Sequence, residues 1–235
     1  MPRILHIETA TESCSSAISD GPDLLALRES HVHRSHAALL TVFIEELFRE
    51  VRMKPEALHA IAVSKGPGSY TGLRIGVSTA KGLAYGSGLP LIAVNTLESM
   101  ARGMDGLIAD QPELAAPDAL LCPMIDARRM EVYRMILDAR HKIIEPTRAE
   151  IIQKDSFNQL LVEKKILFFG SGALKCQEMI RHPNAIFFSE FQNSARHMIS
   201  LALEAFESEK FENSAYFEPY YLKDFVATTP KDKLQ

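Results

Sequence analysis

The segment KGPGSYTGLRIGVSTAKGLAYG, from Lys65 to Gly86, holds the residues best suited to contact an anion. Gly66, Gly68 and Gly72 follow an apolar run that predicts a buried strand and precede a pattern that predicts a helix. Glycines in that setting permit a tight turn whose backbone N–H groups face a phosphate. No Gly-Lys-Ser/Thr follows at the spacing of a Walker A loop. For the loop taken alone, the favoured interpretation is that the glycines only let strand and helix pack closely.

Two acidic residues occupy matching positions, each at the end of a run that predicts a strand. Glu8 ends the first such run of the chain, and Asp126 ends a similar run in the second half. Hydroxyl side chains follow Glu8, whereas Ala127-Arg128-Arg129 follows Asp126, and neither turn contains a glycine. Carboxylates are suitable ligands for the metal of a metal–nucleotide complex. The two turns are therefore candidates for the sides of a nucleotide cleft.

Other reactive side chains lack partners at the spacing that chemistry requires. His31, His33 and His36 have no cysteine or carboxylate positioned to complete a metal site, and a solvated helix start capped by Ser35 is favoured. The sequence contains neither His-Glu-x-x-His nor Gly-x-Ser-x-Gly, so it gives no support to a protease function. No base is identifiable for Ser69. The three cysteines are far apart and predict neither disulfides nor a CxxC metal site.

Composition bounds the class of protein. The chain has 235 residues, of which 46% are hydrophobic and 24% charged, so it can form a core, and disorder, collagen and coiled coil are excluded. Its formal net charge of −4 indicates that the chain as a whole is no electrostatic nucleic-acid binder. No apolar run is long enough for a membrane span. The first residues read as a strand rather than a signal region, so we expect a cytoplasmic protein without disulfides.

The most basic neighbourhood lies in a predicted hairpin of the second half. It contains Arg128, Arg129, Arg134, Arg140, His141 and Lys142. On alternating strands these side chains divide between two faces, and ordinary solvated surface is the favoured interpretation. A small contribution to RNA contact within a larger complex remains open.

The elements that position these residues repeat in one order. In the first half the apolar patterns predict strands over 3–8, 14–20, 24–32, 60–64 and 89–94, and helices over 35–51, 71–85 and 96–102. Residues 103–117 contain two glycines, two prolines and three acids, and predict a linker. In the second half, strands are predicted over 120–126, 131–137, 141–146, 165–169 and 185–188. Helices are predicted over 156–163, from after Gly172 to 181, and over 195–208.

The order βββαβαβα therefore occurs twice. Three meandering strands followed by alternating helices and strands are the ribonuclease-H-like layout, and two copies predict the α/β fold of the actin, sugar-kinase and heat-shock ATPase superfamily. We predict a first domain over 1–104, a smaller second domain over 105–218 and a C-terminal tail over 219–235. The tail is expected to dock through Tyr220, Tyr221 and Phe225 before a polar end.

Two predicted helices of the first domain indicate a protein partner. Gly72, Gly76, Ala80 and Ala84 fall four residues apart and form a ridge without large side chains, which permits close helix approach. Packing within its own domain is the alternative for this ridge. The helix over 35–51 is apolar on more than one stripe and therefore needs burial on two sides. The predicted partner or dimer contacts are Leu39, Phe43, Gly72, Leu73, Ile75, Gly76, Thr79 and Ala80.

Several segments together resemble one bacterial family. These are ILHIETATESCSSAI, HRSHAALL, KGPGSYTGLRIGVSTAKGLA, PLIAVNTLESMA, PMIDARRMEVYRM and PYYLKDFVATTPK, which together extend over nearly the whole chain. The chain resembles the TsaB (YeaZ) family of tRNA threonylcarbamoyladenosine biosynthesis proteins, formerly described as glycoprotease-like. The glycine segment is the most specific part of this resemblance.

The resemblance implies a supporting role in a complex. It implies binding to the threonylcarbamoyltransferase subunit TsaD, which modifies the adenosine beside the tRNA anticodon, and contact with the nucleotide-hydrolysing subunit TsaE. It implies a homodimer when the chain is alone, tRNA contact only through the complex, and ATP and metal on the partner subunits rather than here. Where the catalytic relative reads Asn-His-Leu-Glu-Gly-His, with two metal-binding histidines, this chain has Asn95-Thr96-Leu97-Glu98-Ser99-Met100. Both histidines are replaced, so no catalytic residue and no metal site are expected.

Alternatives remain for the cleft itself. The residues that would form a vestigial nucleotide cleft are Glu8, Thr9, Thr11, Gly66, Gly68, Asp126, Gly170 and Gly172. An autonomous ATPase or small-molecule kinase of the same superfamily is the rival function, and the glycine-free turns argue against it. A metallopeptidase is a remote third possibility. We expect a non-catalytic activating scaffold.

Overall fold

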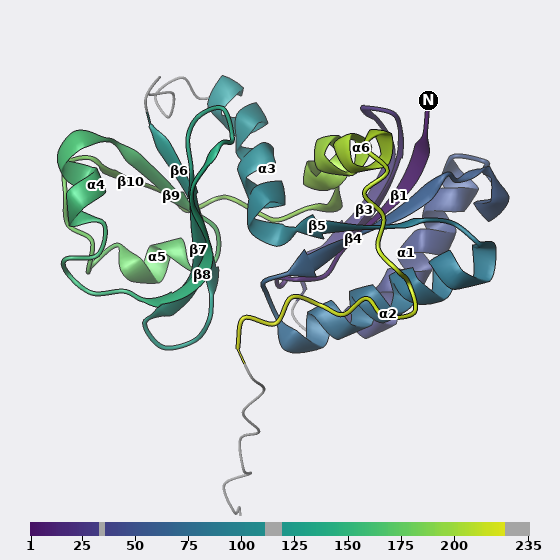
Figure 1. Ribbon diagram of the computed structural model, residues 1–235, viewed down its shortest axis with the longest axis horizontal. Coiled ribbons are helices and arrows are strands. Elements are labelled where there is room, and N and C mark those ends of the chain that lie inside the picture. Colours follow the sequence, from purple (N-terminus) through teal and green to yellow (C-terminus); the bar gives the residue numbers. More distant parts are fainter. Residues whose placement is uncertain (33–35, 111–118, 224–235) are drawn as a thin grey trace, which may run out of the picture.

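Two five-stranded sheets form the frame of the molecule, each at the centre of one lobe (Figure 1). The computed structural model describes residues 1–32, 36–110 and 119–223. The predicted helix start at His33 and Ser35, part of the predicted linker, and Phe225 lie outside these residues. No helix within the described ranges is long and apolar enough to cross a membrane.

The first sheet has the strand order β3-β2-β1-β4-β5. Its strands are β1 (Arg3–Glu8), β2 (Cys14–Asp20), β3 (Asp23–Ser30), β4 (Ala60–Gly66) and β5 (Leu91–Asn95). The first three strands are antiparallel, and β1, β4 and β5 are parallel. Successive side chains of a strand point to opposite faces, so Leu5 and Ile61 face one layer of helices while Ile4 and Ala60 face the other.

The second sheet repeats this arrangement with the order β8-β7-β6-β9-β10. Its strands are β6 (Leu120–Asp126), β7 (Glu131–Leu137), β8 (Ile143–Ile151), β9 (Ile166–Phe169) and β10 (Ala185–Phe188). Again the first three strands are antiparallel and the last two join in parallel. The structure therefore confirms the predicted duplicated ribonuclease-H-like fold.

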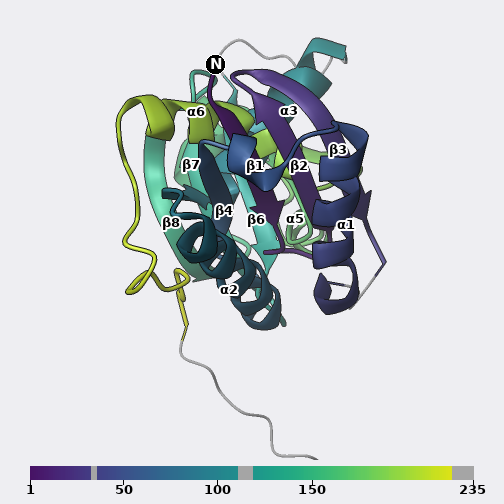
Figure 2. The same ribbon diagram turned by 90° about the vertical axis from the view of Figure 1, so that its right-hand side faces the viewer.

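Helices on the outer faces remain with their own half. After β3 come α1 (His36–Glu50) and the short η1 (Pro55–Ala57), and after β4 comes α2 (Tyr70–Ser87). α1 and α2 cover one face of the first sheet (Figure 2). α2 begins at the Ser69 side chain, which accepts from the Gly72 N–H, and ends at Gly88 in the left-handed region. In the second lobe, α4 (Asn158–Glu163) and α5 (Ala173–Cys176) belong to the outer layer.

The inner helices are exchanged between the two halves. α3 (Thr96–Asp110) packs through Leu97, Met100 and Met104 on the second sheet, although it follows β5 in the chain. η3 (Ala195–Met198) and α6 (Ile199–Glu207) follow β10, yet Met198 and Ala202 pack on the first sheet. Figure 1 shows α3 and α6 between the two lobes.

This exchange differs from two of our predictions. The residues from Gly103 to Asp110 continue α3 rather than forming a linker, because Met104 is buried and Leu107 and Ile108 pack against the core of the second lobe. The predicted boundary after residue 104 therefore falls inside one helix. The hydrophobic repeat of α3 outweighs its two glycines.

Candidate functional site

The two acids at matching strand ends lie in different surroundings. Glu8, at the end of β1, is completely buried, and its Oε1 accepts a hydrogen bond from the Ala10 N–H at 2.6 Å. The side chains of Ser64 and Asn193 face the same carboxyl group. Burial raises the pKa of Glu8 to about 7, although these hydrogen bonds act in the opposite direction. An inward-facing carboxyl group whose protonated form is favoured by burial suits a structural role better than a metal ligand.

The glycine loop is closed against the turn that follows β1. A Cβ atom on Gly68 would lie 2.2 Å from the Ala10 carbonyl oxygen, and one on Gly72 would lie 2.1 Å from the Thr9 carbonyl oxygen. The Ser69 N–H donates to the Ala10 oxygen at 2.7 Å, and the Thr9 hydroxyl donates to the Gly72 oxygen at 2.8 Å. The space and the N–H group that a phosphate would need are thus used within the chain. This supports the packing interpretation of the glycines.

The remaining first-half cleft residues belong to the same closed turn. The Thr11 hydroxyl accepts from the Ser13 N–H, and Ser13 Oγ lies 2.8 Å from His31 Nδ1. His36 Nε2 lies 2.9 Å from the Thr11 carbonyl oxygen. His36 is buried, which differs from the solvated helix start that we predicted. Gly66 has φ +110° and lies under the carbonyl oxygen of Tyr220, which a Cβ atom would approach to 2.9 Å.

In the second lobe a lysine lies beside the acid. The Lys175 ammonium group of α5 contacts Asp126 Oδ1 and donates to the carbonyl oxygens of Arg129 at 2.8 Å and Glu131 at 2.7 Å. Asp126 also accepts from the Arg128 N–H at 2.7 Å. A cation of the chain itself therefore lies among three oxygen atoms beside the predicted cleft acid. Sequence reasoning missed Lys175 because it lies 49 residues from Asp126.

The second pair of glycines is closed as well. A Cβ atom on Gly170 would lie 2.4 Å from Cε of Met100, and one on Gly172 would lie 2.9 Å from the carbonyl carbon of Ile125. Met100 is buried and comes from α3, so the inner helix fills the space beside this turn. Neither half offers the open, N–H-lined cradle that bound phosphates need. The residues of these turns therefore do not fit a bound nucleotide.

Metal-ligating side chains are not grouped in the described part of the chain. Within residues 1–32, 36–110 and 119–223, no three or more His, Cys, Asp or Glu residues lie together as a possible metal site. His6 is buried and His197 is half-buried, and desolvation lowers the pKa of His6 to about 3 and that of His197 to about 4. These two imidazoles are therefore neutral at physiological pH and serve the packing of their own layers.

The predicted partner contacts divide into two groups. Gly72, Leu73, Gly76 and Ala80 are buried inside the first lobe, where Gly76 abuts Thr9, so they are not available to a partner. This corrects the interpretation of the small-residue ridge: it lets α2 approach its own β1–β2 turn. A Leu side chain at Gly76 would disrupt that contact, since even a Cβ atom would lie 2.2 Å from Thr9 Oγ1.

The other predicted contacts lie at the surface where α1 and α2 meet. We define the α1–α2 face as Leu39, Val42, Phe43, Ile75, Thr79 and Leu83. Val42 is 44% exposed, and the others are half-buried. Figure 2 shows the two helices side by side on one side of the sheet. Because four of its apolar members also pack on the core, this face is continuous with the hydrophobic interior.

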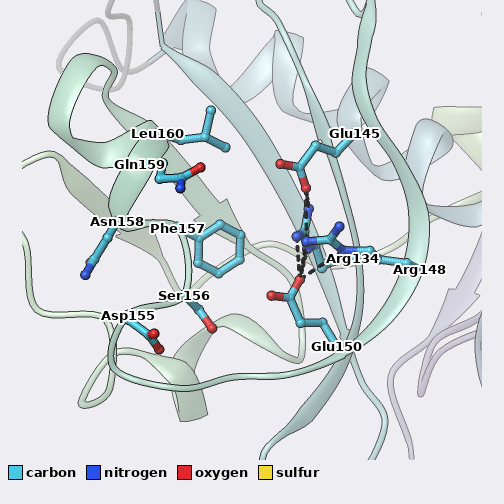
Figure 3. A pocket seen from close by; sticks show the side chains of 10 residues that line it. All are labelled: Arg134, Glu145, Arg148, Glu150, Asp155, Ser156, Phe157, Asn158, Gln159 and Leu160. Atoms are coloured by element: carbon cyan, nitrogen blue, oxygen red, sulfur yellow. Dashed lines mark hydrogen bonds and ion pairs between the residues drawn. The ribbon is translucent and has the colours of Figure 1, made fainter.

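A pocket of about 350 Å³ lies on the outer side of the second lobe (Figure 3). Arg134 of β7 is buried there between Glu145 and Glu150 of β8, and Arg148 bridges the same two carboxylates. The Arg134 guanidinium also lies 5.0 Å from the ring centre of Phe157. We had expected Arg134 at a solvated surface. Its charge is fully paired, so the pocket wall is a structural ion network.

The C-terminal segment joins both lobes. The Glu212 N–H donates to the Leu91 oxygen, and Lys81 Nζ donates to the Phe217 oxygen at 2.8 Å. Further along, the Tyr220 N–H donates to the Lys65 oxygen, which fastens the segment to the glycine loop. The Tyr221 ring then lies 4.9 Å from that of Tyr70, and Lys223 contacts Glu131 of the second lobe. Docking of the tail through Tyr221 agrees with our prediction, whereas its contact with the second lobe had no signal in the sequence.

Comparisons with known proteins place these features in context. Residues 30–230 match the TsaD family, described as tRNA N6-adenosine threonylcarbamoyltransferase. The chain is 31% identical over 183 residues to the tRNA threonylcarbamoyladenosine biosynthesis protein TsaB of Bacillus subtilis, covering 75% of this chain and 74% of that one. It is 38% identical over 131 residues to the Escherichia coli TsaB, covering 56% of this chain and about half, 53%, of that protein.

A solved structure shows the same fold. It is described as an uncharacterized protein with similarity to peptidase YEAZ from Pseudomonas aeruginosa, and it superposes with a TM-score of 0.82. The superposition covers 95% of this chain and all of that one, at 23% sequence identity. This similarity shows that the two chains share one fold.

Proposed function

Because the chain belongs to the TsaB family of tRNA threonylcarbamoyladenosine biosynthesis proteins, and matches the wider threonylcarbamoyltransferase family, we propose that it acts in threonylcarbamoyladenosine modification of tRNA. Its proposed place is that of an accessory subunit in the cytoplasm, which binds and activates the transferase subunit TsaD. The match to the Bacillus TsaB over three quarters of both chains is the observation that carries this proposal.

The absence of its own catalysis is the second part of the proposal. Thr96 and Met100 occupy the positions at which the catalytic relative is expected to have metal-binding histidines. Both are buried: the Thr96 hydroxyl lies 2.7 Å from Ser64 Oγ, and Met100 packs in the core of the second lobe. The closed glycine loops support the same conclusion. ATP and metal are therefore assigned to the partner subunits.

The proposed contact with the transferase is the α1–α2 face. Its exposed and half-buried apolar side chains form the surface that a second pair of helices can cover. Without the transferase, the same face is proposed to form a homodimer. TsaE joins the assembled pair, and tRNA is modified on the transferase.

A charged substitution on this face provides the test. We expect Val42→Arg to abolish co-elution with the purified transferase and to convert the free chain to a monomer, because an arginine would be desolvated in the contact. Threonylcarbamoyl-adenosine synthesis by the reconstituted complex should fall with it. Size-exclusion chromatography with light scattering and a nucleoside assay measure both effects.

Val162→Arg is the matched control. Val162 is 75% exposed on α4 of the second lobe, so the same change in side chain occurs far from the proposed contact. The control should behave like the unaltered chain. Full synthesis by Val42→Arg, or equal loss in both variants, would refute the assigned surface.

The rival function has its own test. An autonomous ATPase or kinase would require turnover by the isolated chain. We expect no ATP hydrolysis above that of a blank without the chain, while synthesis by the transferase depends on adding it. Hydrolysis by the chain alone, together with synthesis in its absence, would favour the rival.

A further inference from the structure

A line of cations and tyrosines runs from one lobe to the other. On α2 the Arg74 guanidinium lies 5.5 Å from the centre of the Tyr70 ring, which contacts Tyr221 of the C-terminal segment. Two residues later Lys223 Nζ lies 5.9 Å from the centre of the Tyr133 ring on β7. Arg128 stands in the turn before β7; burial raises the pKa of Tyr133, and Lys223 and Arg128 are near enough to oppose that rise. We call Arg74, Tyr70, Tyr221, Lys223, Tyr133 and Arg128 the cation–tyrosine strip.

The strip is accessible and locally positive. Arg74, Arg128 and Tyr221 are exposed, and the other three members are half-buried. Arg129 is exposed beside it, and the Lys175 ammonium group lies at its side in contact with Asp126. The carboxylates in contact with the strip or acting on it are Asp126 and Glu131, each paired with a lysine, and Glu218, which adds to the effect of burial in raising the pKa of Tyr221. Cations therefore outnumber carboxylates here, although the whole chain carries −4.

The backbone at one end of the strip is strained where the arginines stand. Arg128 has φ 71° and Arg129 has φ 51°, in the turn between β6 and β7. This left-handed region favours glycine or asparagine over a long side chain. The turn nevertheless presents two exposed guanidinium groups towards solvent. Strained residues of this kind point to a function of their side chains rather than to stability.

We propose that the cation–tyrosine strip binds an unpaired stretch of RNA. Guanidinium and ammonium groups contact phosphates, and tyrosine rings offer faces on which unpaired bases stack. The inference rests on the proposed function, because it adds a contact by this chain to the tRNA that the complex modifies. Arg134 is not part of this site, because it is buried between two carboxylates. Of the basic residues in the hairpin, the proposal therefore uses Arg128 and Arg129.

The test replaces the strained arginines with residues that suit the turn. Fluorescence anisotropy measures binding of an unmodified, labelled tRNA anticodon stem-loop to the full chain at several salt concentrations. Arg128→Asn/Arg129→Gly removes two positive charges and places Asn-Gly in the turn, the pair that best tolerates positive φ at both positions. We expect the melting temperature to hold or rise and the dissociation constant to increase at least about fivefold. The slope of log K against log salt should fall by about 1.4, or ~0.7 per lost phosphate contact.

Arg140→Asn/Lys142→Asn is the matched control. It removes the same charge from the turn at the other end of β7. There the backbone N–H groups of both residues donate to Asp138 Oδ1, and these hydrogen bonds do not depend on the replaced side chains. This control should bind RNA like the unaltered chain. Lys223→Gln gives an independent variant in the middle of the strip and should weaken binding with a slope change of about 0.7.

Three results would overturn the inference. These are no RNA binding at the lowest salt, equal losses in the strip and control variants, or equal affinity for an acidic peptide of matching charge. Failure here is distinguishable from failure of the proposed function. Arg128→Asn/Arg129→Gly should still co-elute with the transferase, because co-elution depends on the α1–α2 face and not on RNA.

Discussion

The two matching turns after β1 and β6 are closed in opposite ways. After β1 the acid is Glu8, which is completely buried and faces hydroxyl, amide and backbone N–H groups. After β6 the acid is Asp126, whose side chain is 49% exposed and contacts the Lys175 ammonium. Each turn is followed, later in its half, by a glycine loop packed against it. The same fold thus closes one cleft side by burial and the other by charge.

This difference shows which lobe carries the tighter constraint. In the first lobe, a Cβ atom added to Gly68, Gly72 or Gly76 would lie within 2.2 Å of an atom of Thr9 or Ala10. In the second lobe the distances are longer: an added Cβ would lie 2.9 Å from the Ile125 carbonyl carbon at Gly172, and at Gly170 it would lie 2.4 Å from Met100 Cε and 2.5 Å from the Met124 oxygen. The proposed partner face also belongs to the first lobe. The β1–β2 turn packs against Gly72 and Gly76 of α2, so this contact helps to fix the position of α2 and with it the α1–α2 face.

Gly72→Ala should give the largest effect on this comparison. The added Cβ would lie 2.1 Å from the backbone oxygen of Thr9, which no side-chain rotation relieves. We expect the free energy of unfolding to fall by more than about 3 kcal/mol, measured by urea titration. Gly82→Ala on the same helix is the control, since nothing lies within 4 Å of its added Cβ.

Helix propensity predicts that the control is stabilised by up to about 1 kcal/mol. A mild effect at Gly72, comparable to that of Gly172→Ala in the second lobe, would break the comparison. It would mean that the turn after β1 moves aside, and the first lobe would not be the more constrained one.

Glu8→Gln should show how burial controls the first turn through pH. Because burial raises the pKa of Glu8 from 4.5 to about 7, folding favours its protonated form. Its contribution to stability is therefore fully present below pH 4.5 and is lost as the pH rises through 7. The amide variant does not lose it. Relative to the unaltered chain, we expect Glu8→Gln to gain about 2 kcal/mol between pH 5 and pH 8.

Urea titrations of both proteins at several pH values measure this gain. His6 and His197 have lowered pKa values, so their contributions are lost in the other direction, as the pH falls below 6.5. Both histidines are present in the two proteins, and the difference between the curves isolates Glu8. Curves that run parallel from pH 5 to pH 8 would show that Glu8 does not titrate in this range.

Local patterns predicted the elements of both halves, and long-range contacts explain what they missed. Several strands, including Arg3–Glu8 and Leu120–Asp126, match the predicted bounds, because alternating and buried apolar runs fix strands locally. The exchange of α3 and α6 between sheets left no local signal. An amphipathic helix shows that it has a buried face but not which sheet covers that face.

The candidate site was predicted less well than the fold for the same reason. Gly72 and Gly76 have the spacing of a smooth ridge, and that spacing is equally consistent with a partner helix and with the Thr9 turn. Only the folded positions decide between them. The prediction of Phe43 and Ile75 as partner contacts rests on the excess of apolar surface on their helices, which is a local property, and it stays a prediction. Lys175 and Lys223 act across 49 and 92 residues, beyond any spacing rule.

Lys175→Met should give the smallest effect and isolate closure by charge in the second lobe. The change retains an unbranched side chain of similar length but removes the donors to Asp126 and to the Arg129 and Glu131 oxygens. We expect a loss of about 1 kcal/mol, because the pair is partly exposed and screened by solvent. Lys164→Met, at an exposed lysine after α4, should change stability by less than about 0.5 kcal/mol.

A double-mutant cycle with Asp126→Asn separates the ion pair from the two carbonyl contacts. Since Asp126 is about half exposed, its coupling with Lys175 should be about 0.5 kcal/mol and should shrink in 1 M salt, whereas the carbonyl contacts should persist. If the coupling survives high salt undiminished, the second turn is closed by packing, as the first is. In that case the two turns would differ only in that Glu8 is buried and Asp126 is exposed.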